Sequence, residues 1–179
     1  MTSLDPADPL SSGFRKEIQV PISIFLAHQR EQLGLISDEF EVLADIAVRL
    51  ASDGKRLRPA FCTWGYLAFA DAEYPPTWIY AISASLDLLH VSALIHDDVM
   101  DSSATRRGVP AAHKQLEALH RERGLSGSPE VFGRNGAILL GNLMWSWSAE
   151  MANWVRLPKD TFQDAMITLD RIRTQVNAG

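Results

Sequence analysis

The sequence predicts an all-α fold in a single domain, and three observations lead to this prediction. Apolar residues recur at helical spacing through most of the 179 residues, and no stretch alternates strictly between turn pairs as a strand does. Apolar residues make up 46% of the chain and charged residues 22%, which is typical of a globular protein. The length suits one core. We expect a flexible tail over residues 1–12 and an all-α domain over residues 13–179.

The breaks in this periodicity divide the chain into eight segments. Gly34 and Gly54 can end helices, Asp38 with Glu41 resembles a capping box, and Pro158 suits a first helical turn. The expected helices cover residues 11–32, 38–51, 57–70, 76–102, 110–123, 135–155 and 158–179, with a short turn at 129–132.

Charge and cysteine content exclude several classes of protein. The formal net charge is −5, whereas nucleic-acid binding needs clustered basic residues, so we expect no nucleic-acid partner. The single cysteine, Cys62, cannot form a disulfide within the chain and fits a small buried apolar position. We find no signal peptide and no segment with the roughly 20 apolar residues of a membrane span. These features predict a soluble, cytoplasmic protein.

The segment "LIHDDVMDSSATRRG", residues 94–108, concentrates negative charge at the end of an apolar helix. Asp97 and Asp101 are four residues apart and share one face, while Asp98 is rotated by about 100°. Because like charges at this spacing repel, a cation is expected, and Mg²⁺ binds one or two carboxylates together with water and phosphates. The alternative is a solvated acidic helix end paired with Arg106 and Arg107.

Two basic clusters accompany the aspartates. Arg106 and Arg107 follow the helix, and "GKRLRP" at residues 54–59 places Lys55, Arg56 and Arg58 at a helix start. Guanidinium groups and helix N-termini both favour phosphate oxygens, so two anion sites are expected. Each cluster taken alone is better explained as a solvated surface than as a ligand site.

Three motifs together identify a family resemblance: "GKRLRP", "LLHVSALIHDDVMD" and "TRRGVPAAH". In order and separation they resemble the trans-type polyprenyl diphosphate synthases. "AILLGNLMWSWSAE" and "RTQVNAG" are similar to later segments of the same family. The resemblance implies an isoprenoid-synthase helical bundle around a deep apolar cavity, usually a homodimer. It also implies a reaction that joins isopentenyl diphosphate to an allylic diphosphate.

The resemblance assigns roles to the charged residues. It implies that Asp97 and Asp101 hold Mg²⁺ against the allylic diphosphate, with Asp98 in support, and that Arg106 binds the same diphosphate. The residues implied for isopentenyl diphosphate are Lys55, Arg58, His90 and Arg107. For His90 the alternative is a core histidine with satisfied hydrogen bonds.

Product length follows from the residues below the aspartates. Ser92 and Ala93, one turn away, are both small, so we expect no block to the hydrocarbon tail there. Leu89 and Leu86 form the next layers, and a geranylgeranyl or longer product is expected with one of them as the floor. The alternatives are that these residues only pack helices, or that another helix supplies the floor.

Two departures from the family pattern affect the expected activity. Asn142 follows Gly141 where the family has Gly-Asp, and the family's second aspartate-rich motif and later helices are missing from these 179 residues. We therefore expect a truncated bundle that is a poor catalyst alone and associates through uncovered apolar faces. The other candidates are a class I terpene cyclase, which needs no second substrate site, and a non-catalytic partner subunit, which is expected to lose the first aspartates.

Overall fold

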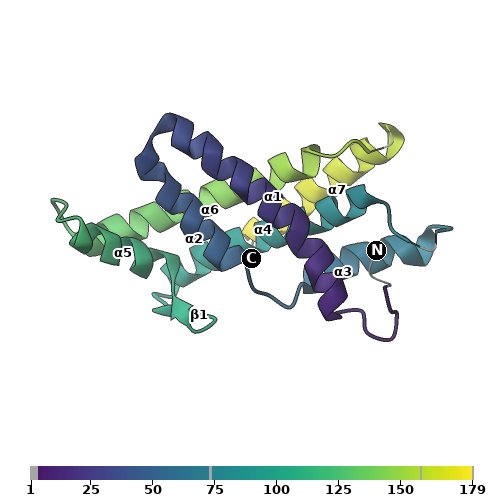
Figure 1. Cartoon of the computed structure of the whole chain (residues 1–179), viewed down its shortest axis with the longest axis horizontal. Helices are drawn as coiled ribbons and strands as arrows, with labels where there is room; N and C mark the ends of the chain where they lie inside the picture. Colours follow the sequence, from purple (N-terminus) through teal and green to yellow (C-terminus); the bar gives the residue numbers. More distant parts are fainter. Residues whose placement is uncertain (1–3, 73, 158, 179) are drawn as a thin grey trace.

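The computed structural model describes residues 4–72, 74–157 and 159–178, and in these residues almost all regular structure is α-helical (Figure 1). This confirms the predicted all-α class. The elements are α1 (Ser12–Ile36), the 3-10 helix η1 (Asp38–Phe40), α2 (Glu41–Ala51), α3 (Leu57–Phe69), α4 (Thr77–Met100), β1 (Thr105–Arg106), β2 (Val109–Pro110), α5 (Ala112–Glu122), α6 (Pro129–Asn153) and α7 (Lys159–Ala178).

Helix α4 is the central element of the bundle. It packs against α6, α3 and α1, and its apolar residues face several neighbours at once, as in a helix that is hydrophobic nearly all round. By length and composition α4 could cross a membrane, contrary to the expectation that no segment reaches that length. However, 67% of its most apolar window is buried inside the fold, which is the environment of a core helix.

The remaining helices complete two groups of buried side chains. Helix α1 begins after Ser11, whose hydroxyl accepts a hydrogen bond from the Phe14 backbone N–H at 3.1 Å. Its buried face packs against α2 and α4. Helix α7 contributes Leu169 to a second group with Ile82 of α4 and Ala152 of α6. The outer helices therefore hold α4 in place from several sides.

Helix α6 differs from the sequence prediction, because it runs without a break from Pro129 where we expected a turn and a new helix at residue 135. The Ser128 hydroxyl accepts a hydrogen bond from the Val131 N–H at 3.4 Å, and Pro129 fits the first turn. The glycine at position 133 serves close packing: a Cβ there would lie 2.3 Å from the His113 carbonyl oxygen of α5. Its presence in the helix reflects this contact.

A short antiparallel hairpin connects α4 to α5, although the sequence showed no strand pattern. Arg106 pairs with Val109, and the two residues between them, Arg107 and Gly108, have φ angles of 53° and 80°. Positive φ at both positions is the requirement of the tight two-residue turn that joins antiparallel strands. Strands of two residues are too short to show alternation, so periodicity could not detect them.

Candidate active site

The three aspartates at the end of α4 are not equivalent. The Asp97 side chain is 51% exposed, whereas the Asp98 side chain is only 3% exposed. Asp101 is exposed and forms the C-cap of α4, where its N–H donates to the Asp97 carbonyl at 2.8 Å. The outer two carboxylates are therefore accessible from solvent and the middle one faces the protein, as helical geometry predicts.

Arg106 explains why Asp98 can be buried. Its Nε donates to Asp98 Oδ1 at 2.9 Å, and its Nη2 contacts both Asp98 and, at 3.3 Å, Asp97 Oδ2. The hydrogen bond to Asp98 raises the pKa of Arg106 above its ordinary value. The alternative for the acidic segment was a pairing of its aspartates with Arg106. This pairing is present for Asp98 and Asp97.

The carboxylates at the end of α4 fit Mg²⁺ better than a cation whose ligands must all come from protein side chains. In the residues that the structure describes, no group of three or more His, Cys, Asp or Glu side chains is arranged to hold a metal ion. Two exposed carboxylates one turn apart suffice for Mg²⁺ if water and phosphate oxygens complete its shell. Asp97 and Asp101 are the residues that could hold it.

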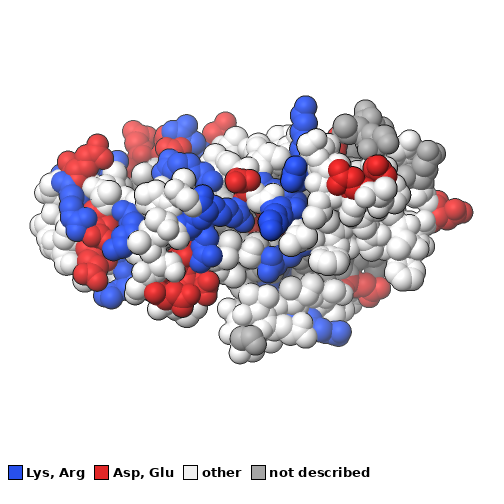
Figure 2. Space-filling model, turned by 90° about the horizontal axis from the view of Figure 1, so that it is seen from below, with Lys and Arg blue, Asp and Glu red and all other residues white. Residues whose placement is uncertain are grey.

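A basic pocket of about 410 Å³ lies between the start of α3, the middle of α4 and the hairpin. It brings together Lys55, Arg58, His90 and Arg107, which come from three separate motifs. Sequence reasoning missed Arg15, which α1 adds to the wall. Figure 2 shows this side of the molecule, with basic side chains gathered near its middle. The complete lining is Arg15, Asp53, Gly54, Lys55, Arg56, Leu57, Arg58, Asp87, His90 and Arg107.

Arg107 packs closely against Gly54, and both residues line the basic pocket. A Cβ on Gly54 would lie 3.2 Å from Arg107 Nη1 and 3.4 Å from Nη2. The turn conformation therefore directs Arg107 toward the 52–56 loop, while its neighbour Arg106 is bound to Asp98. Two consecutive arginines thus serve different parts of the site.

His90 is uncharged in this environment. Burial lowers its pKa from 6.5 to about 4, and the positive charges of Arg58, Arg107 and Arg106 act in the same direction. At neutral pH its imidazole has one N–H donor and one acceptor nitrogen. It can therefore donate a hydrogen bond to a phosphate oxygen without adding to the repulsion among the arginines.

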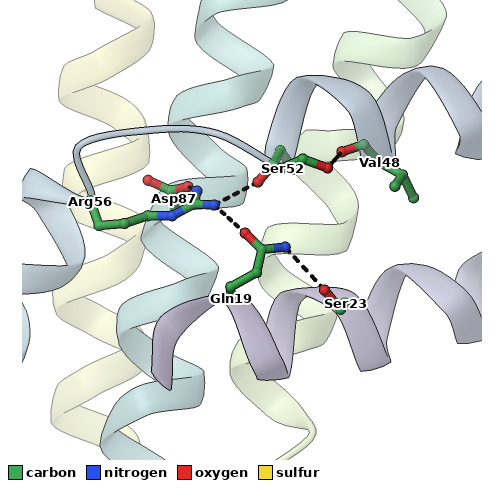
Figure 3. Close-up of polar contacts among 7 residues, drawn as sticks. Gln19, Ser23, Val48, Ser52, Arg56 and Asp87 are labelled. Carbon is green, nitrogen blue, oxygen red and sulfur yellow. Dashed lines mark hydrogen bonds and ion pairs between the residues drawn. The ribbon is translucent and has the colours of Figure 1, made fainter. Parts of the chain in front are cut away.

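Arg56 has a different role from its neighbours in "GKRLRP". Its side chain is 2% exposed and pairs with Asp87 of α4, and it also contacts Gln19 of α1 and the Ala51 carbonyl at 2.7 Å (Figure 3). The sequence predicts one anion site from Lys55, Arg56 and Arg58 together, whereas the Arg56 side chain points inward. The signal for its partner was Asp87 itself, because a carboxylate in an apolar helix needs a paired cation.

An apolar pocket of about 450 Å³ adjoins the basic one. Ala93, Leu89 and Leu86 of α4 line it, together with side chains of α3 and α7. Ser92 does not line it: its hydroxyl donates to the Gly141 carbonyl of α6 at 2.7 Å. Successive helical residues are turned by about 100°, and here Ser92 is turned toward α6 while Ala93 lines the pocket. The full lining is Arg58, Phe61, Cys62, Leu86, Leu89, His90, Ala93, Ile172 and Val176.

The two pockets have opposite chemistry and share a wall. Arg58 and His90 line both of them. His90, Ala93, Asp97 and Asp101 are spaced three, four and four residues apart, so they follow one face of α4 toward its acidic end. Asn142 is exposed on α6. The site can accommodate a molecule with an anionic head and a long apolar tail.

Comparison with known proteins identifies the family. Residues 40–179 match the polyprenyl synthetase family, so the chain belongs to it. It is 29% identical over 128 residues to a nonaprenyl diphosphate synthase of Mycobacterium tuberculosis, covering 68% of this chain and 33% of that one. It is likewise 29% identical over 126 residues to a geranylgeranyl diphosphate synthase of Methanosarcina mazei, covering 70% and 33%.

A solved structure supports the same assignment at the level of the fold. The geranylgeranyl pyrophosphate synthase of Corynebacterium glutamicum, solved with isoprenyl diphosphate and magnesium, superposes with a TM-score of 0.73 at 31% identity. The match covers 78% of this chain and 40% of that one. The fold is therefore that of the isoprenyl diphosphate synthases. The chain spans about a third of the length of the curated relatives it matches.

Proposed function

We propose that this chain carries the substrate-binding part of a prenyltransferase that joins isopentenyl diphosphate to an allylic diphosphate. The observation that supports this most directly is the shared wall of the basic and apolar pockets at Arg58 and His90. A prenyl diphosphate has the same two parts, a dianionic or trianionic head and a hydrocarbon tail. The basic pocket suits the head, and the adjoining apolar pocket suits the tail.

The charged residues divide between two diphosphates in this proposal. Lys55, Arg58 and Arg107 balance the charge of isopentenyl diphosphate, and neutral His90 donates a hydrogen bond to it. Arg106 remains fixed by Asp98 and presents its remaining donors to the allylic diphosphate. Asp97 and Asp101 would hold Mg²⁺, which supplies stabilisation of the charge that develops on the departing diphosphate.

The apolar pocket is the proposed site of the allylic tail. Ala93 leaves room directly below the metal-binding face, and the side chains of Leu89 and Leu86 come next along α4. We infer a geranylgeranyl or longer product, with these leucines as the floor. Phe61, Ile172 and Val176, contributed by α3 and α7, are further candidates for the floor.

We infer that the 179-residue chain binds these ligands better than it turns them over. In its described residues the metal-binding side consists of two exposed carboxylates, and efficient stabilisation of a transition state needs charges fixed on both sides of it. Exposed apolar residues such as Phe61 and Leu139 favour association with a second copy of the chain. We therefore propose a homodimer. We also propose that the protein is located in the cytoplasm.

A class I terpene cyclase is the second candidate, because it also ionises an allylic diphosphate. A cyclase uses one diphosphate substrate and needs no separate basic pocket. The convergence of Lys55, Arg58, His90 and Arg107 in one cavity therefore favours chain elongation. Binding of isopentenyl diphosphate in the absence of any allylic substrate discriminates between the two.

The test is incorporation of labelled isopentenyl diphosphate onto farnesyl diphosphate with Mg²⁺, comparing the chain with its Asp97→Ala variant. We expect the unmodified chain to turn over slowly and to form products of 20 carbons or more. We expect Asp97→Ala to lose this turnover. Cyclised hydrocarbon from farnesyl diphosphate alone would overturn the proposal in favour of the cyclase. If neither protein turns over, calorimetric binding of isopentenyl diphosphate that Arg58→Ala abolishes still supports the binding role, and no binding contradicts it.

A further inference from the structure

Arg56 and Asp87 form a buried contact that joins three helices beside the basic pocket (Figure 3). The guanidinium of Arg56 donates to Asp87 on α4, to Gln19 on α1 and to the Ala51 carbonyl at the end of α2. Gln19 is held in turn by Ser23, whose hydroxyl accepts from Nε2 at 3.0 Å. One side chain therefore ties the 52–56 loop to the three helices around it.

The position of Arg56 in the chain gives this contact its importance. Arg56 lies directly after Lys55 and two residues before Arg58, and all three belong to the segment that starts α3. It has a left-handed backbone, with φ 55° and ψ 34°, which a residue with a side chain adopts only when its surroundings hold it there. The buried side chain supplies that restraint, while Lys55 and Arg58 are exposed.

The charges around Asp87 suggest why a carboxylate is used. Asp87 lies among Arg56, Arg58 and Arg107, each of which interacts with it electrostatically. Arg107 and Arg56 both approach Gly54, since a Cβ there would lie 3.2 Å from Arg107 and 3.5 Å from Arg56. Without the Asp87 carboxylate, these guanidinium groups would repel one another.

We propose that Arg56 and Asp87 are positioning residues of the basic pocket, whose ion pair holds the 52–56 loop so that Lys55 and Arg58 face His90 and Arg107. This inference rests on the proposed function of the pocket as the isopentenyl diphosphate site. Both residues line the pocket, and the role proposed for them is to position its cations rather than to bind the ligand. Their effect is to fix three cationic groups in one arrangement before the diphosphate arrives.

Electrostatics and positioning make opposite predictions for Asp87→Asn, which makes this variant the main test. Removing a negative charge from the wall of an anion site should tighten binding if charge alone matters. If Asp87 positions the loop, isopentenyl diphosphate should bind about tenfold more weakly. The measurement is the Kd by calorimetry without Mg²⁺, so that the aspartates of α4 do not contribute.

Asp53→Asn is the matched control, because Asp53 lines the same pocket and is exposed. It removes the same charge without disturbing the Arg56 contact, and we expect its Kd to be equal to or lower than that of the unmodified chain. Circular dichroism confirms that each variant is folded. An Asp87→Asn variant that binds as well as Asp53→Asn overturns the inference.

A second variant covers the case in which Asp87→Asn fails to fold. Arg56→Met with Asp87→Leu replaces the pair with apolar side chains of similar size, which buried ion pairs commonly tolerate. We expect this protein to unfold at a similar temperature and yet bind isopentenyl diphosphate about tenfold more weakly. Unchanged Kd in the folded double variant contradicts the positioning role.

The assay also separates this inference from the function it rests on. Arg58→Ala removes a proposed ligand-binding cation and should weaken binding in the unmodified background. If the unmodified chain and Arg58→Ala both fail to bind, the proposed function of the pocket is wrong. If Arg58→Ala weakens binding while both Arg56–Asp87 variants leave it unchanged, only the positioning role is wrong.

Discussion

Arg106 Nε lies 2.9 Å from Asp98 Oδ1, and this contact pairs the buried middle aspartate of the 97–101 segment with a cation. The Asp98 side chain is 3% exposed, and Asp97 beside it is 51% exposed. Aspartates that are adjacent in sequence thus have different environments. The consequences for stability, pH dependence and packing can each be measured.

Asp98→Ala should destabilise the fold much more than Asp97→Ala. Removing Asp98 leaves Arg106 without its main partner and costs about 1 to 3 kcal/mol, because only the carboxylate side of this pair is fully buried. Asp97→Ala changes an exposed side chain and should alter the free energy of unfolding by less than about 0.5 kcal/mol. Urea denaturation measures the free energy of unfolding of both variants. Equal losses of stability would show that Asp97 and Asp98 do not have different environments.

His90 should make the protein less stable as the pH falls. Its pKa is 6.5 in an ordinary environment and about 4 in the fold. The unfolded chain therefore takes up a proton first, and the free energy of unfolding decreases from pH 6.5 toward pH 4. His90→Gln has no titrating group at this position, so its stability should fall less over the same range.

The free energy of unfolding of the unmodified chain and of His90→Gln is measured at pH 7 and at pH 4.5. The difference between the two proteins isolates the contribution of His90. Burial also lowers the pKa of His113, but His113 is present in both proteins, so its contribution cancels in the difference. Stability curves that run parallel for the two proteins would contradict the environment described for His90.

Alanine at three helical glycines should give three different results. At Gly65 a Cβ meets nothing within 4 Å, so Gly65→Ala should stabilise α3 by up to about 1 kcal/mol. At Gly133 it would lie 2.3 Å from the His113 backbone oxygen, and Gly133→Ala should cost about 2 to 3 kcal/mol. Gly141→Ala would meet the His96 ring at 2.2 Å and should cost less than Gly133→Ala, because a ring can rotate away.

Thermal or urea unfolding of these three variants provides the measurement. Gly65→Ala serves as the control for the general effect of alanine in a helix. A Gly133→Ala protein as stable as Gly65→Ala would show that α5 and α6 do not approach as closely as described.

Ala93→Phe should weaken the binding of a long allylic diphosphate and spare a short one. Ala93 lines the apolar pocket, and a phenyl group there would fill space that the tail needs. We expect binding of farnesyl diphosphate to weaken about tenfold and binding of dimethylallyl diphosphate to change little. Calorimetry with both ligands in Mg²⁺ measures this.

Ser92→Ala is the matched control for that experiment. It removes the hydrogen bond to the Gly141 carbonyl and should cost about 1 kcal/mol of stability. Because Ser92 faces α6, the relative affinity for the two allylic diphosphates should stay the same. A change in that ratio comparable to the effect of Ala93→Phe would mean that the tail runs along the other side of α4.

The sequence predicted most of the helices and the placement of Asp97 and Asp101 on one helix face, apart from Asp98. Apolar spacing of 3.6 residues and the position of the aspartates at the end of an apolar run are local properties, and local reasoning is sufficient for them. The convergence of "GKRLRP", His90 and "TRRG" was expected only from the family resemblance. The structure places Lys55, Arg58, His90 and Arg107 around one pocket.

Other features depend on contacts between distant segments. Arg56 and Arg58 are equally basic in sequence, and only the position of Asp87 on α4 decides that Arg56 is buried. Ser92 and Ala93 are equally small, and the neighbour at α6 decides which one faces the apolar pocket. The hairpin was missed because two-residue strands have no periodicity, although Gly108 after Arg107 was a local sign of a tight turn.

The hairpin acts as a spacer between the two negatively charged ligands of the proposed reaction. Arg106 is anchored at the end of α4 and Arg107 reaches the loop before α3, so in the proposed function the span between the two diphosphates depends on this turn. One residue added to that turn would keep every charged group in the chain and still change this span. Two enzymes with identical binding residues could therefore differ in rate through the length of one turn alone.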